Sequence, residues 1–310
     1  MPTHPPDIWF PNLNFWLQRV PRYVFSVGGF EIYWYAAFIV LGIICAALAA
    51  FWYAHKTGQQ VTDYLDLLIL GLVLSFIGLR LYFMAFNWDI YRGRNFFAAF
   101  FDIRGGGLAI YGGILGALLA GYIISRRKKI PITTITDTAG PSLALGQAIG
   151  RIGNFFNREA FGGYTDNLFA MRIRVDQAMY TTPELVERVY TFQGVDYMQV
   201  HPTFLYESIF NFVLFAALVL YRPHRRFNGE MIFLYMLGYG AARFFIEGLR
   251  TDQLMLFGTG FPVSQVVSVL FVLFAAVMLF RGYTGRMKPS PVPVHTKRAS
   301  RKKSGKTRRK

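Results

Sequence analysis

Long apolar stretches alternate with short polar loops along most of the chain. Seven stretches of about 20 residues contain few charged side chains, and this is the length of helix that crosses a lipid bilayer. They lie at roughly 33–53, 63–86, 107–125, 133–150, 203–221, 230–247 and 262–280. The pattern predicts an all-α polytopic membrane protein with seven transmembrane helices.

The longest stretch between apolar segments, residues 155–200, has a different periodicity. Phe169, Met171, Ile173 and Val175 alternate with small or charged residues. Because successive side chains of a strand point to opposite faces, this spacing indicates a strand. We therefore expect a small, partly β cap over one end of the helical bundle.

The first 32 residues do not have the pattern of a secretory signal peptide. They contain no basic segment ahead of an apolar core and no small-residue cleavage site. Their aromatic residues Trp9, Phe10, Phe15 and Trp16 are typical of a segment that lies in the interface between lipid and water. The expected organisation is an interfacial segment (1–32), a seven-helix domain (33–280) that includes the cap (155–200), and a C-terminal tail (281–310).

Composition agrees with a membrane protein. Apolar residues make up 54% of the chain and charged residues 16%, against roughly 25% charged residues in an ordinary soluble domain. The lone cysteine, Cys45, lies inside an apolar stretch, so an intrachain disulfide and a cysteine metal cluster are both impossible. Disorder of the whole chain, a coiled coil and a secreted disulfide scaffold are excluded.

The net charge of +16 is concentrated at the C-terminus. Residues 281–310 hold 12 of the 33 Lys and Arg residues and no acidic residue, which leaves +4 on the other 280 residues. Such a tail is typical of a disordered segment that contacts anionic lipid headgroups. Because it has no interleaved aromatic residues and no predicted fold, nucleic-acid binding is the weaker interpretation.

Basic residues are distributed unequally between the two sets of loops. The loops after the first, third and fifth spans, together with the tail, hold 20 basic residues, and the opposite side holds 11. The positive-inside rule therefore places the C-terminus in the cytoplasm. With seven spans, the N-terminus and the cap are expected on the opposite side.

Polar and ionisable residues gather at the outer ends of the spans. Such residues are costly inside a bilayer and therefore mark candidate functional sites. Those that share a helix face are Gln147, Arg151 and Asn154 on the fourth span, Glu207 and Asn211 on the fifth, and Arg243, Glu247 and Arg250 on the sixth, while Arg80 ends the second. An Arg–Glu pair that only holds helices together explains any single pair equally well. The set of four Arg and two Glu, however, predicts an anionic ligand, and the planar guanidinium fork suits a phospholipid phosphate.

Glycines are dense around the start of the third span. Gly112 and Gly116 have the small-xxx-small spacing of a helix-packing face. Gly106 and Gly107 lie just outside the span, in the triple glycine 105–107, where either a packing role or a close approach of the backbone to a lipid headgroup is expected.

Residues 150–162 read GRIGNFFNREAFG and match the signature G-R-x-G-N-F-x-N-x-E-x-x-G at every fixed position. On this segment the chain resembles the bacterial prolipoprotein diacylglyceryl transferases. The resemblance covers residues 25–280 and includes Tyr33-Trp34-Tyr35, Gly78-x-Arg80, Gly106-Gly107, Tyr111-Gly112-Gly113, His201-Pro202-Thr203-x-Leu205-Tyr206-Glu207 and the segment from Arg243 to Asp252.

The resemblance implies an enzyme of the bacterial inner membrane, with a periplasmic N-terminus and a cytoplasmic C-terminus. It would transfer the diacylglyceryl group of phosphatidylglycerol to the lipobox cysteine thiol of prolipoprotein signal peptides, the first step of lipoprotein maturation. The products are a thioether and glycerol phosphate, and neither a metal nor an organic cofactor is implied. The alternative is a polytopic phospholipid transporter or flippase, in which polar residues near the midplane and internal repeats are expected. A metal-dependent hydrolase lacks support, because none of the five His residues has a metal-ligand spacing.

The expected chemistry assigns roles to these residues. Arg151 and Arg243 would hold the phosphate and stabilise the charge that develops as it leaves. Asn154 would donate to the headgroup, Glu247 would orient an arginine, and Gly162 would allow close passage of the backbone. The full set of expected substrate-binding residues is Tyr35, Arg80, Gly106, Gly107, Arg151, Asn154, Gly162, Glu207, Glu247 and Arg250.

Tyr111 is the third expected catalytic residue, beside Arg151 and Arg243. Many family members have His at this position, where it is given the role of thiol-activating base. A phenol has an ordinary pKa of about 10 and a thiol about 8.5, so Tyr111 needs a strongly lowered pKa to act as a base. A role in hydrogen bonding the phosphate is the alternative.

Overall fold

The structure is a computed structural model that describes residues 2–28, 30–102, 106–256 and 258–287. Nearly all of the predicted tail, from residue 288, lies outside the described residues, as does Gly105. The long helices are α1 (Trp34–Lys56), α2 (Val61–Phe86), α5 (Ile110–Lys128), α6 (Ile132–Asn157), α8 (Thr203–Tyr221), α9 (Glu230–Leu249) and α10 (Val263–Tyr283). The short helices are α3 (Trp88–Tyr91), α4 (Phe96–Phe101) and α7 (Pro183–Glu187).

The long helices follow the predicted apolar stretches closely. Pro131, Pro202 and Pro262 directly precede α6, α8 and α10, where a proline sets the backbone for a helix start without removing a helical hydrogen bond. Among the residues that the structure describes, five helices are long and apolar enough to cross a membrane, namely α1, α2, α8 with its following turn (Thr203–His224), α9 and α10. Helices α5 and α6 occupy the other two predicted spans but are more polar.

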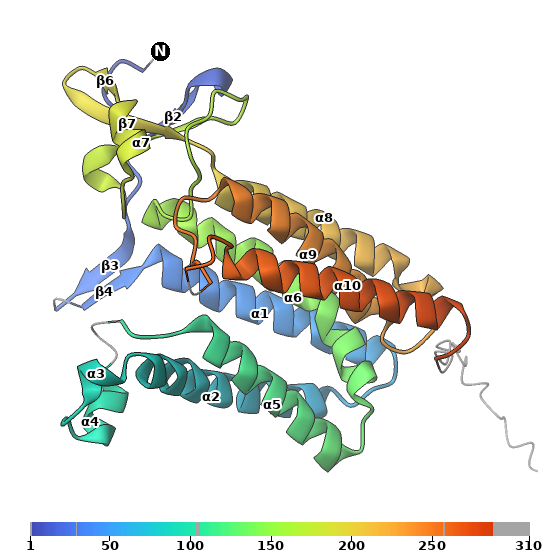
Figure 1. Ribbon diagram of the computed structural model, residues 1–310. Helices are drawn as coiled ribbons and strands as arrows, with labels where there is room; N and C mark the ends of the chain where they lie inside the picture. The colour runs from blue at the N-terminus through green and yellow to red at the C-terminus, as the bar shows by residue number, and fades with distance from the viewer. Residues whose placement is uncertain (1, 29, 103–105, 257, 288–310) are drawn as a thin grey trace, which may run out of the picture.

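The long helices form two groups (Figure 1). Helix α2 packs along α5, while α6 lies at the centre of the second group and contacts α1, α8 and α9, with α10 against α9. Glycine makes the close contacts possible, because a Cβ atom on Gly78 or Gly112 would overlap the backbone of the other helix, and a Cβ on Gly116 would overlap the backbone at Leu74. The predicted helix-packing role of Gly112 and Gly116 is therefore confirmed.

A five-stranded antiparallel sheet forms the cap, in the order β2-β1-β5-β7-β6. Its strands are β1 (Ile8–Phe10), β2 (Phe15–Leu17), β5 (Met171–Arg174), β6 (Tyr190–Phe192) and β7 (Val195–Val200). Met171 and Ile173 on β5 are buried, whereas Arg172 and Arg174 are half-exposed. The strand predicted from this alternation is confirmed.

The N-terminal residues of the predicted interfacial segment form part of the cap. Strand β1 pairs with β5, so Trp9 and Phe10 are buried inside the cap. The Trp9 ring packs edge-on against Tyr197, and the Arg172 guanidinium lies 4.5 Å from the Trp9 ring centre. This partner strand is distant in the sequence, and the aromatic composition of the segment alone did not reveal it.

A two-stranded hairpin, β3 (Tyr23–Val27) and β4 (Phe30–Tyr33), connects the cap directly to α1. Figure 1 shows the hairpin at the same end of the molecule as α3 and α4. The cap, the hairpin and these short helices thus surround the end of the bundle where α6 ends and α8 begins.

Candidate active site

Helices α6, α8 and α9 bring two arginines onto one buried carboxylate. Arg151 on α6 donates from Nη2 to Oε1 of Glu207, and Arg243 on α9 donates from Nη1 to Oε2 of the same residue, both at 2.9 Å. Glu207 on α8 is only 2% exposed. Because each carboxylate oxygen binds one guanidinium, Glu207 fixes the separation and orientation of the two arginines.

A second carboxylate extends this network along α9. Arg243 Nη2 lies 2.6 Å from Oε2 of Glu247, and Arg250 Nε lies 3.9 Å from the same oxygen. The guanidinium fork of Arg250 is filled by Asp252, with Nε–Oδ1 and Nη2–Oδ2 distances of 2.9 and 2.6 Å. Glu247 therefore orients Arg243, and Asp252 binds one edge of the Arg250 guanidinium.

The expected surplus of positive charge is wrong for this network. Arg151, Arg243 and Arg250 are balanced by Glu207, Glu247 and Asp252. The fourth arginine of the predicted set, Arg80, makes its contacts elsewhere. An anion bound here would have to use guanidinium donors that the carboxylates leave free, rather than an uncompensated charge.

Arg80 binds backbone carbonyl groups. Its side chain is buried, and it donates to Phe100 O at 3.0 Å, Asp102 O at 2.8 Å and Gly107 O at 2.9 Å, with further bonds to Ala99 O and Gly106 O. Gly106 and Gly107 have φ angles of 85° and 82°, which favour glycine. Arg80 therefore holds the end of α4 close to Gly106 and Gly107, which precede α5, and all its nitrogen atoms are occupied by protein.

The end of α6 carries a second polar cluster, made of the signature residues. Asn154 Nδ2 and Asn157 Nδ2 both donate to Oε1 of Glu159, at 2.9 and 3.1 Å. The side-chain oxygen Oδ1 of Asn154 in turn accepts a hydrogen bond from Arg151 Nη1 at 3.4 Å. Asn154 thus connects Glu159 to the arginine pair.

Gly162 joins the signature loop to the end of α9. It forms an antiparallel bridge with Arg250, and its N–H donates to His201 O at 2.8 Å. A Cβ atom at this position would overlap the carbonyl oxygen of Leu249. The close backbone passage expected at Gly162 exists, and the partner is the protein's own backbone.

The two tyrosines of the predicted site lie in different helix groups. Tyr35 lies in the first turn of α1 and packs on α6, because a Cβ on Gly153 would lie 3.1 Å from the Tyr35 Cα. Tyr111 is in the first turn of α5, and its ring lies 6.3 Å from that of Tyr82 on α2. Within the described ranges, nothing hydrogen-bonds the Tyr111 hydroxyl, so the structure does not bring it into the arginine network.

Several polar residues near the network were not among the predicted site residues. The Tyr239 hydroxyl lies 3.5 Å from Glu207 Oε1, and one turn deeper the Tyr235 hydroxyl donates to Gln147 at 3.0 Å. Glu159 and Asn157 could have been found, because both are fixed positions of the signature. Tyr239 could not, because a tyrosine in an apolar helix is an ordinary core residue.

His201 has a structural position. It lies between β7 and α8, its backbone pairs with Gly162 and Gly163, and its Nδ1 is 3.3 Å from the Tyr206 hydroxyl. Burial lowers the pKa of His201, which favours the neutral imidazole. This agrees with the interpretation that it supports the start of α8.

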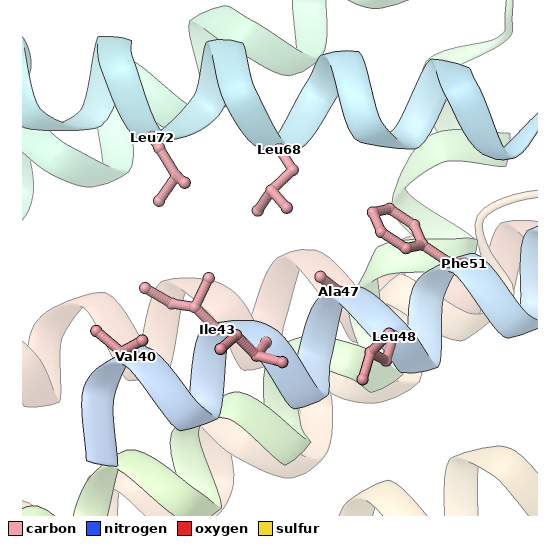
Figure 2. A pocket seen from close by; sticks show the side chains of 8 residues that line it. Val40, Ile43, Ala47, Leu48, Phe51, Leu68 and Leu72 are labelled. Carbon is pink, nitrogen blue, oxygen red and sulfur yellow. The ribbon is translucent and has the colours of Figure 1, made fainter. Parts of the chain in front are cut away.

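An apolar cleft separates α1 from α2 (Figure 2). Its volume is about 480 Å³, and its lining is made only of aliphatic and aromatic side chains. Those on α1 are Val40, Ile43, Ile44, Ala47, Leu48 and Phe51, and those on α2 are Leu68 and Leu72. The cleft begins within two turns of Tyr35 along α1.

Comparison with known proteins gives a consistent answer along the whole helical domain. The family model described as prolipoprotein diacylglyceryl transferase matches residues 22–281. A phosphatidylglycerol–prolipoprotein diacylglyceryl transferase of Finegoldia magna is 39% identical over 83% of this chain and 94% of its own length. Proteins of the same name from Clostridioides difficile and Listeria monocytogenes are 38% and 36% identical, over 81% and 89% of this chain and 91% and 93% of their own lengths. The chain therefore belongs to the prolipoprotein diacylglyceryl transferase family.

Proposed function

We propose that this protein transfers the diacylglyceryl group of phosphatidylglycerol to the lipobox cysteine thiol of prolipoproteins. The reaction forms a thioether and releases glycerol phosphate. Membership of the family supports the activity, and the observation that carries its assignment to this site is the convergence of Arg151 and Arg243 on Glu207. Two guanidinium groups held at a fixed separation suit the phosphate group of a phospholipid.

The arginine pair would act on the leaving phosphate. Each guanidinium has five N–H donors, and the carboxylate contacts to Glu207 and Glu247 use only some of them. When the carbon–oxygen bond of the lipid breaks, negative charge grows on the phosphate oxygens. Donors that are already oriented stabilise this charge more than they stabilise the bound lipid, and the reaction is accelerated for that reason.

The remaining parts of the lipid would be held by elements around the pair. We infer that an acyl chain occupies the apolar cleft between α1 and α2, whose lining has no polar side chain. Tyr35, Asn154 and Glu207 are proposed to border the headgroup. Arg80, Gly106 and Gly107 would contribute indirectly, by shaping the loop before α5, and Glu247 and Arg250 by orienting Arg243.

We propose that the protein crosses the bacterial inner membrane seven times, with α5 and α6 as the two more polar spans. The polar groups of α6 bind neighbouring helices, as Asp137 does when it accepts from the backbone N–H groups of Gly229 at 2.7 Å and Met231 at 3.0 Å. A polar helix whose groups are satisfied by protein is tolerated inside a bilayer. The distribution of basic residues then favours a periplasmic cap and N-terminus and a cytoplasmic C-terminus.

The test is a reconstituted reaction. Purified protein is mixed with phosphatidylglycerol and a peptide that contains a lipobox cysteine, and the peptide mass is measured. We expect the peptide to gain one diacylglyceryl group, and phosphatidylcholine in place of phosphatidylglycerol to give little product. An unmodified peptide after incubation with a well-folded, monodisperse protein would contradict the proposed function.

A further inference from the structure

We propose that Glu159 is the base that accepts the proton of the lipobox thiol, an inference that rests on the proposed transferase function. Glu159 follows α6 in the signature segment, and its side chain turns back toward the last helical turn. There its Oε1 accepts two hydrogen bonds, from Asn154 at 2.9 Å and Asn157 at 3.1 Å. No described residue donates to Oε2, and the side chain is only partly buried. This oxygen is available to a substrate.

The other carboxylates of the site are occupied by arginine. Glu207, Glu247 and Asp252 each have an oxygen within 2.6–2.9 Å of a guanidinium nitrogen. Glu159 has no such partner in the part of the chain that the structure describes. A guanidinium stabilises the charged form of a carboxylate and makes it a poorer proton acceptor, and the two donors that hold Glu159 are amide groups without a net charge.

The backbone on both sides of Glu159 is in an unfavourable conformation. Arg158 and Ala160 have φ angles of 55° and 54°, in the left-handed region that non-glycine residues rarely adopt. Both residues make long-range contacts that hold them in place. Arg158 Nη2 lies 3.5 Å from Asp7 Oδ2, and the backbone carbonyl of Ala160 accepts a hydrogen bond from the Thr203 hydroxyl. Strain of this kind persists where the surrounding structure imposes it, and it clusters at functional sites.

The position of Glu159 also fits the reaction. Asn154 contacts Glu159 through its amide nitrogen and Arg151 through its carbonyl oxygen, at 2.9 and 3.4 Å. One side chain therefore connects the proposed base to the proposed phosphate ligand. A thiol that approaches the glycerol carbon of a lipid bound at Arg151 would come within reach of the free Glu159 oxygen.

The proton and electrons balance as follows. The thiol proton passes to Glu159 Oε2 while the sulfur electron pair forms the carbon–sulfur bond. The carbon–oxygen bond to the phosphate breaks, and its electron pair leaves on glycerol phosphate. Glu159 then returns to the carboxylate form by giving its proton to solvent or to the phosphate monoester, whose second pKa is about 6.

With Glu159 as the base, the reaction does not depend on a tyrosine hydroxyl, that of Tyr111, to accept the thiol proton. A phenol with an ordinary pKa of about 10 must first lose its own proton before it can accept another, whereas a carboxylate with an ordinary pKa of about 4.3 is already ionised at neutral pH. The carboxylate is the weaker base, and the nearby arginines would offset this by stabilising the developing phosphate charge. Tyr111 is then not required to accept a proton.

The experiment compares the wild type with Glu159→Gln, which keeps the size of the side chain and an oxygen that can accept from the asparagines. Rates are measured from about pH 6 to pH 9 with saturating phosphatidylglycerol, using a lipobox peptide with cysteine and one with selenocysteine. At neutral pH we expect the transfer rate of the variant with the cysteine peptide to be about 10²–10⁴-fold lower than that of the wild type. Its rate should then rise about tenfold per pH unit up to the thiol pKa near 8.5. The selenocysteine peptide should restore most of the rate at neutral pH, because a selenol ionises there without a base.

A matched control is Glu184→Gln, which removes an exposed carboxylate in the first turn of α7 and should leave the rate unchanged. The inference is overturned if Glu159→Gln keeps the wild-type transfer rate and pH profile. It is also overturned if the substitution lowers the transfer rate by the same factor with both peptides at every pH, because a structural defect would have that effect. A wild-type protein that modifies neither peptide would instead refute the proposed function and the inference with it.

Discussion

Alanine substitution of the two site arginines should reduce the transfer rate similarly but lower stability unequally. Arg151 donates one 2.9 Å hydrogen bond to Glu207. When Arg151 is removed, Glu207 still accepts the hydrogen bond from Arg243. Loss of one hydrogen bond to a charged group costs about 1.5–3 kcal/mol. Arg243 instead binds two buried carboxylates, and without it Glu247 keeps only the 3.9 Å approach of Arg250. A buried charge left without its partner costs about 3–5 kcal/mol.

The thermal unfolding midpoint in detergent should therefore fall about twice as far for Arg243→Ala as for Arg151→Ala. Both variants should lose at least about 10²–10³-fold in transfer rate, the factor typical of removing one donor to a developing charge. Arg→Lys at either position should restore little activity, because a single ammonium group cannot bind a carboxylate and a phosphate with a planar fork. Size-exclusion chromatography in detergent controls for folding.

Two results would refute this reasoning. Near-normal turnover by either alanine variant would remove that arginine from the phosphate site. Equal unfolding midpoints for the two variants would show that Arg243 does not stabilise both Glu207 and Glu247.

Four further outcomes are expected. Tyr111→Phe should keep the rate within a few-fold and the same pH profile, whereas a 10²–10⁴-fold loss would make the hydroxyl the base. Gly162→Ala should lower stability by about 1–3 kcal/mol through backbone overlap, and Gly163→Ala, which has open space, should not; equal unfolding midpoints would contradict the close passage. Because burial lowers the pKa of His201 in the folded protein, the unfolded state takes up the proton first, so the free energy of unfolding should decrease as pH falls below about 6.5. A His201→Asn variant should lose that dependence, as pH-resolved thermal unfolding would show. Deletion of 287–310 should leave activity in detergent largely intact, because the tail is proposed to lie on the side of the membrane opposite the site. Complete loss of activity in a well-folded truncation would contradict the proposed topology.

The helical part of the fold could be predicted because apolar periodicity and proline positions are local signals. Stretches around Leu48 and Phe274 have no alternative to a buried or lipid-facing helix. The strand at Met171–Arg174 could be predicted for the same reason, since alternation within one strand is local. The pairing of β1 with β5 could not, because it joins segments separated by more than a hundred residues and leaves no periodic trace.

The candidate site was predictable only as far as helix faces show it. Spacing placed Arg243 and Glu247 on one face, and the structure joins them at 2.6 Å. Residue spacing within one helix does not indicate which helices contact one another. Arg80 was therefore grouped with the other arginines, although its guanidinium binds the backbone carbonyl of Gly107. Glu159 is a fixed position of the signature and could have been named from the sequence, but its contacts with Asn154 and Asn157 depend on a turn with two left-handed residues, which the sequence of a non-glycine turn does not reveal.

The fate of the bridging oxygen of the lipid shows which bond of phosphatidylglycerol is broken during transfer. Phosphatidylglycerol is prepared with a heavy oxygen isotope between the diacylglycerol carbon and the phosphorus, and is incubated with the wild-type protein and a lipobox peptide. We expect one glycerol phosphate to be released for each peptide that gains a diacylglyceryl group, with the heavy isotope in the glycerol phosphate. A heavy isotope that stays with the diacylglycerol moiety, or release of glycerol phosphate without any gain in peptide mass, would contradict it.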